Sequence, residues 1–136
     1  MALTKVTSAV LADNSVDSDN YVDGSIDTIH LADDTISYDK LGAEFTTAAT
    51  LSASDVDFST AQVFTKTLTA NDTLTFSNVS TGMVKDLVIT GDFTLALPAS
   101  VKVISGTYDG TVSNLIQIVA TNGATEQWAS ISQEAV

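Results

Sequence analysis

The chain of 136 residues has no cysteine, no arginine, one histidine and one proline. Without cysteine, neither a disulfide framework nor a thiolate zinc site can form. A single histidine and no thiol exclude most pairs of a nucleophile and a general base. No apolar run is long enough for a signal peptide or a membrane span. We therefore expect synthesis in a cytoplasm, no membrane insertion and no cofactor.

The charge is strongly one-sided. Seventeen acidic residues stand against five lysines, which gives a net charge of -12. Residues 1–60 hold eleven of the acids and two of the lysines, a net charge of -9. Nucleic-acid binding is not expected, because it needs cationic side chains that neutralise phosphates. The acidity can prevent sideways association of an elongated molecule, or it can match a basic surface of a partner.

The sequence over residues 6–42 repeats every ten residues. Two apolar columns follow this period: Val6, Val16, Ile26 and Ile36, and Leu11, Tyr21, Leu31 and Leu41. A fixed period indicates one supersecondary unit used several times. Each unit has too few apolar side chains to offset the ordering entropy of ten residues. The columns must therefore be buried against neighbouring repeats or other chains.

Local structure within one repeat can be predicted from its turn residues. Asp23-Gly24-Ser25 and Asp33-Asp34-Thr35 have turn chemistry, and the segment after each turn is short and extended. Residues 27–31 can then open one helical turn, with Asp27 near its exposed amides. The period is neither seven nor eleven, which disfavours a coiled coil. We expect an extended ladder of strand, turn and short helix around a symmetry axis.

From about Gln62 the sequence predicts a second domain. Short runs rich in Val, Ile, Thr and Phe alternate with turn residues and show no helical period. The predicted strands are Val63–Thr69, Thr73–Asn78, Met83–Thr90, Phe93–Leu97, Val101–Ser105, Leu115–Thr121 and Gln127–Ser132. About seven strands at this spacing predict an antiparallel β-sandwich or jelly roll. The expected fold is thus mainly β, with a repeat stalk at 1–60 and a knob at 61–136.

The repeat units, with their Leu-Ala-Asp and Ser/Thr-Ile/Val motifs, resemble the decameric "LADGSI" arrays of tailed-bacteriophage fibre proteins. Residues 67–132, with Leu68-Thr69-Ala70-Asn71-Asp72 and Leu95-Ala96-Leu97-Pro98, are similar to the small β-rich knobs that end many such fibres. This resemblance implies a homotrimer on the virion surface, made in a bacterial host cytoplasm. We place six column residues toward the trimer axis: Leu11, Val16, Ile26, Leu31, Ile36 and Leu41.

An enzyme is not expected, and no catalytic, cofactor or metal residue is assigned. His30 lies at a variable position of the repeat, which predicts a solvent-facing side chain. Residues 17–24 only superficially resemble a calcium loop, because Tyr21 stands at its fifth position. No motif joins the four knob carboxylates Asp86, Asp92, Asp109 and Glu126 into a glycosidase pair. Trp128 and Tyr108 could face a sugar, although a lone strand tryptophan is more often core or interface.

Three function classes remain. The first is a capsid-decoration or head-fibre protein bound to the phage coat. The second is a short tail fibre or fibre tip that binds a host surface glycan or protein. The third is a non-viral adhesin or interaction module. The early start of the repeats favours the first class and predicts attachment to the virion through Met1, Leu3 and Val6, with the knob pointing outward.

Overall fold

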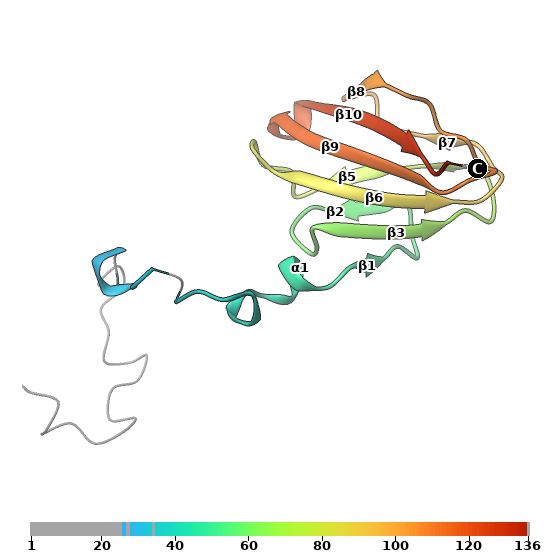
Figure 1. Cartoon of the computed structure of the whole chain (residues 1–136). Helices are drawn as coiled ribbons and strands as arrows, with labels where there is room; N and C mark the ends of the chain where they lie inside the picture. Colours follow the sequence, from blue (N-terminus) through green and yellow to red (C-terminus); the bar gives the residue numbers. More distant parts are fainter. Residues whose placement is uncertain (1–25, 27, 34, 136) are drawn as a thin grey trace, which may run out of the picture. The chain divides into compact units, whose positions relative to one another are not determined.

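The computed structural model describes residues 26, 28–33 and 35–135 (Figure 1). The chain divides into two units between Ser37 and Tyr38. In the first unit, the 3-10 helix η3 (Thr28–His30) is closed by a hydrogen bond from Leu31 N to Thr28 O, 3.3 Å. At the start of the second unit, η4 (Tyr38–Lys40) has the same bond ten residues later, from Leu41 N to Tyr38 O, 3.2 Å. Both described repeats thus contain a helical turn at the same position.

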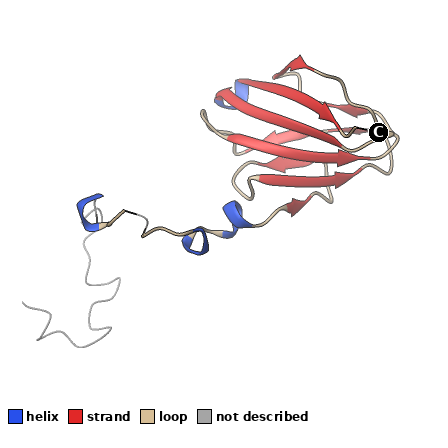
Figure 2. Ribbon diagram, in the orientation of Figure 1, coloured by secondary structure: helices blue, strands red, loops and turns tan. Residues whose placement is uncertain are grey.

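The second unit continues with one helical turn, α1 (Ala43–Thr46), and then consists mainly of strands (Figure 2). The strands are β1 (Ala49–Thr50), β2 (Asp55–Asp57), β3 (Val63–Thr67), β4 (Asp72–Thr73), β5 (Thr75–Ser77), β6 (Val84–Thr90), β7 (Leu95–Ala96), β8 (Val101–Ser105), β9 (Asn114–Asn122) and β10 (Glu126–Gln133). A 3-10 helix, η5 (Gly123–Thr125), joins the last two strands. The first two strands lie inside the range predicted as stalk.

These strands form a β-solenoid of about three turns. The chain returns to the same sheet in the same direction, so β1, β3 and β6 pair in parallel. On the other sides, β2 pairs with β5 and β4 pairs with β7, also in parallel. Phe64 lies beside Leu87 and Asp72 beside Leu95, so one turn takes 23 residues at both places. In Figure 1, β5 and β7 lie behind the sheet that contains β6 and β9.

A hairpin completes the main sheet, whose strand order is β1-β3-β6-β9-β10-β8. β9 runs antiparallel to both β6 and β10, and β8 lies parallel to β10 at the sheet edge. The prediction of a mainly β fold is confirmed, whereas the antiparallel sandwich is corrected to a solenoid. Period-two alternation tells which side chains face inward, but it is the same for both strand directions. Alternation could therefore locate strands without determining how they pair.

The core lies inside the solenoid. Its buried apolar side chains are Val56, Phe58, Ala61, Phe64, Leu68, Leu74, Leu87, Ile89, Ile116, Ile118 and Ala129. The rings of Phe58 and Phe76 pack with their centroids 5.1 Å apart. One cation enters this interior: Lys85 is 5% exposed and donates hydrogen bonds to Ala61 O (2.7 Å) and Gln62 Oε1 (2.5 Å). These bonds compensate the ammonium group for part of its lost hydration.

Candidate interaction surfaces

The described members of the apolar columns are exposed in the single chain. Their exposed fractions are 48% for Ile26, 45% for Leu31, 58% for Ile36 and 39% for Leu41. Another chain could therefore bury these side chains. Their position at a trimer axis stays a prediction. Leu11 and Val16, and the attachment residues Met1, Leu3 and Val6, lie outside the described residues.

His30 is exposed at the end of η3. Among residues 26, 28–33 and 35–135, no group of three or more His, Asp or Glu side chains is arranged to hold a metal ion. Over the same residues, no helix is long and apolar enough to cross a membrane.

Two of the four knob carboxylates named above, Asp86 and Asp109, accept separate hydrogen bonds. Asp86 Oδ1 accepts a 3.2 Å bond from Gln117 Nε2. Asp109 Oδ1 accepts bonds from the backbone N (2.9 Å) and the hydroxyl (2.7 Å) of Thr111, and these bonds lower the pKa of Asp109. Burial raises the pKa of Tyr108, and the negative charges of Asp92 and Asp109 add to this shift. These carboxylates belong to strands and turns.

Tyr108 is a structural side chain rather than an exposed platform. Its hydroxyl donates a 2.8 Å hydrogen bond to Gly91 O, and its ring packs against the core. It thereby ties the loop before β9 to the corner that follows β6. This position does not support the suggestion that Tyr108 faces a sugar ligand.

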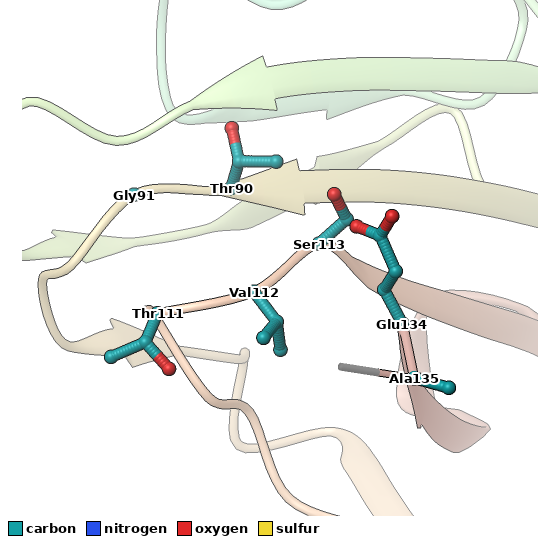
Figure 3. A pocket seen from close by; sticks show the side chains of 8 residues that line it. Thr90, Gly91, Thr111, Val112, Ser113, Glu134 and Ala135 are labelled. Atoms are coloured by element: carbon teal, nitrogen blue, oxygen red, sulfur yellow. The ribbon is translucent and has the colours of Figure 1, made fainter.

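An open depression of about 340 Å³ lies beside the same corner (Figure 3). Among the described residues that line it, Glu134 alone is charged, and Figure 3 shows this carboxylate directed toward Ser113. The backbone N of Glu134 donates a 2.9 Å bond to Ser113 O, which joins the residue after β10 to the residue before β9. Glycoside hydrolysis usually needs two carboxyl groups, and the described lining residues supply one. We assign no chemistry to this depression.

A stronger candidate lies on the outer face of the main sheet. Val84 pairs with Val119, and Val119 pairs with Trp128, across β6, β9 and β10. Trp128 is 43% exposed and Ile104, at the edge strand β8, is 60% exposed. Together Val84, Ile104, Val119 and Trp128 line a depression of about 400 Å³, and we call this surface the Trp128 face. Trp128 is thus neither core nor buried within this chain.

Polar contacts hold the indole of Trp128 in place. Its Nε1 donates a 3.0 Å hydrogen bond to Glu126 Oε1, which also accepts a 3.0 Å bond from Thr121 Oγ1. The other carboxylate oxygen pairs with Lys102 Nζ. The bond from Lys102, then those from Trp128 and Thr121, lower the pKa of Glu126 from 4.5 to about 2. A charged carboxylate therefore orients the ring at neutral pH.

Comparison of the chain with protein-family models, with curated proteins and with solved structures found no match. The function proposed below is therefore inferred from the sequence pattern and the surfaces of this chain.

Proposed function

We propose that this protein is a non-enzymatic structural protein of a bacteriophage virion. It forms a homotrimer in which the ten-residue repeats make a stalk and the β-solenoid makes a head. Capsid decoration, as a head fibre or cement protein on the particle surface, is the first assignment. Its partners are two further copies of itself and the phage coat.

The exposure of the apolar columns carries this proposal. Ile26 and Ile36 belong to one column and Leu31 to the other, and each has about half of its surface exposed in the single chain. Single exposed apolar side chains are common on protein surfaces and follow no period. Exposed apolar side chains that recur at a fixed period instead indicate an interface. A symmetry axis along the repeats would bury one residue of each column per unit in every copy.

Light scattering on the purified chain tests the trimer. We expect a mass three times the 14.2 kDa of one chain. Ile36→Asp places three carboxylates in one layer of the seam and should cost several kcal/mol per trimer, so that smaller species appear. Ile29→Asp is the matched control, since Ile29 is 85% exposed and lies outside both columns. A wild-type monomer, or equal loss of assembly in both variants, contradicts the proposal.

Attachment to a coat is supported by the charge distribution. The first 60 residues carry a net charge of -9, which suits a basic surface. Deleting residues 1–12 should leave a folded trimer that no longer binds particles lacking the native protein. Unchanged binding of that truncation would place the docking surface on the head. Salt should weaken the charge contacts and leave the apolar contacts of Met1, Leu3 and Val6.

A second candidate is a short tail fibre or fibre tip that binds a host surface glycan or protein. The observation that favours it is the exposed, oriented indole of Trp128 on the head. Copy number per purified particle separates the two candidates. Coat decoration requires a number that scales with the capsid lattice, whereas a tail fibre is present only in the small multiples set by tail symmetry.

A further inference from the structure

The Trp128 face differs in charge from the rest of the molecule. The chain carries a net charge of -12, yet none of the described residues that line this depression is charged. Gln117, Thr121 and Ser130 add neutral polar groups to its lining, and Ala129 adds an apolar one. Two strongly acidic copies repel each other wherever carboxylates face carboxylates. The lining of this face is uncharged, and its charged neighbours are paired at the margin: Asp86 with Gln117, and Glu126 with Lys102. Such a surface is the place where two copies can approach at the lowest electrostatic cost.

The polar groups of this face are already prepared for burial. The indole N–H of Trp128 has its partner in Glu126, and Glu126 has Lys102 and Thr121. A partner that covers the indole therefore leaves no donor of the ring unsatisfied, and an unsatisfied buried donor would oppose the contact. The Glu126–Lys102 pair lies beside the ring, since Lys102 pairs with Trp128 in the sheet register. An aromatic centre with a polar margin is typical of protein interfaces.

We propose that the Trp128 face is covered by a second copy of this chain, so that the heads contact one another through Val84, Ile104, Val119 and Trp128. This inference rests on the proposed trimer, which holds three heads together and raises their effective concentration. The head contact is then a second interface, separate from the apolar columns of the repeats. It assigns these four exposed apolar side chains a common role.

A glycan is the competing occupant, and the contacts favour a protein surface. Sugar hydroxyls need polar partners that are available next to the aromatic ring. The carboxylate nearest the indole, Glu126, is already engaged by three groups. On the β9 side the ring pairs with Val119, which pairs in turn with Val84, so this flank is aliphatic. On the β8 side it pairs with Lys102, which Glu126 engages. The aliphatic flank matches apolar side chains of a second copy better than the hydroxyls of a pyranose.

Fluorescence tests the contact directly, because Trp128 is the only tryptophan of the chain. In the single chain the indole is 43% exposed, so acrylamide should quench it readily. If the heads pack through this face, quenching of the full-length trimer should be several-fold weaker and its emission shifted to the blue. Light scattering on the same sample gives the mass. A trimer with a readily quenched indole overturns the head contact alone, whereas a monomer overturns the proposed function as well.

Variants distinguish a second copy from other covers. Val119→Asp puts a carboxylate between Val84 and Trp128, in the middle of the proposed contact, so the heads should separate and quenching should rise several-fold while the repeats keep the trimer mass. Val84→Ser is a milder second variant, should Val119→Asp fail to fold by circular dichroism. Phe93→Asp is the matched control, because Phe93 is 42% exposed and lies outside the face.

Three results count against the head contact. The first is an indole that stays shielded in both folded face variants. The second is the same rise in quenching for Phe93→Asp. The third is a wild-type indole that is quenched readily until a host glycan is added, which would assign the face to a receptor.

Discussion

Phe64 and Leu87 lie side by side on the parallel strands β3 and β6, although 23 residues separate them in the sequence. Both side chains are buried, with exposed fractions of 1% and 0%. The contact joins two successive turns of the solenoid, so it connects segments that no short-range pattern relates. Part of the buried core of the head is therefore formed by contacts between turns.

Leu87→Ala should remove one of these contacts and leave a cavity in a fully buried site. Truncations of this kind cost about 2–5 kcal/mol, from lost burial and the residual cavity. Chemical denaturation of the head, followed by circular dichroism, measures the loss. Val88→Ala is the matched control, because Val88 is the next residue of β6 and points away from the core. Similar losses in the two variants would argue against the interior placement of Leu87.

Gly91→Ala should destabilise the corner after β6. Gly91 has φ +112°, and a Cβ there would lie 2.4 Å from Leu68 O on the preceding turn. A left-handed backbone costs an L-residue about 1–3 kcal/mol, and the clash adds to it. Gly82→Ala is the control, since Gly82 has φ +89° and a Cβ there would meet no atom of the described residues within 4 Å. If the close approach of Gly91 to Leu68 O matters, Gly91→Ala should have a lower midpoint of thermal unfolding than Gly82→Ala. Equal midpoints would mean that this close approach adds no cost.

Much of the head could be predicted from residue alternation. The segment Val101–Ser105 forms β8 with the predicted bounds, and the observed β6, β9 and β10 differ from the predicted strands by one residue at some ends. Direction could not be predicted, because inward and outward positions alternate identically in parallel and antiparallel strands. The 23-residue length of a turn could not be predicted either, because positions that lie side by side can have different residue types. Asp72, for example, lies beside Leu95.

The first turn and the Trp128 face were missed for different physical reasons. β2 contains a single apolar residue, Val56, between two aspartates. The sequence pattern therefore assigned it to the acidic stalk instead of the head. Alternation predicted that Trp128 and Ala129 point to opposite faces of their strand, and the structure confirms this for β10. The face itself needs Val84 and Val119 from two other strands, and only the strand register brings them together.

Lys85→Met should destabilise the head although it removes a buried charge. The side chain is 5% exposed, and burial lowers the pKa of its ammonium group. Methionine keeps the volume, but it leaves Ala61 O and Gln62 Oε1 without the donor that they share. Each buried acceptor left unpaired costs about 1–3 kcal/mol. Denaturant titration measures the change, with Lys40→Met as the control, because the Lys40 side chain is 63% exposed. A stabilised Lys85→Met protein would show that the desolvation cost exceeds the value of the two bonds.

Acid should destabilise the head in a defined window, and Glu126 provides the test. Hydrogen bonds from Lys102, Trp128 and Thr121 lower the pKa of Glu126 from 4.5 to about 2 in the folded chain. A carboxyl group with a lowered folded pKa contributes stability above its unfolded pKa and loses it as pH falls through the folded value. The pKa of Asp57, lowered first by the bond from Asn78, and that of Asp72, lowered first by the bond from Ser54, act in the same direction.

The free energy of unfolding should therefore fall as pH decreases below about 4.5 and keep falling toward 2. Glu126→Gln removes one titrating group and should make this decline shallower. Denaturation midpoints between these two pH values provide the comparison. An unchanged slope in Glu126→Gln would mean that its contacts with Lys102 and Trp128 do not favour the ionised form, and the orientation of the indole would need another cause.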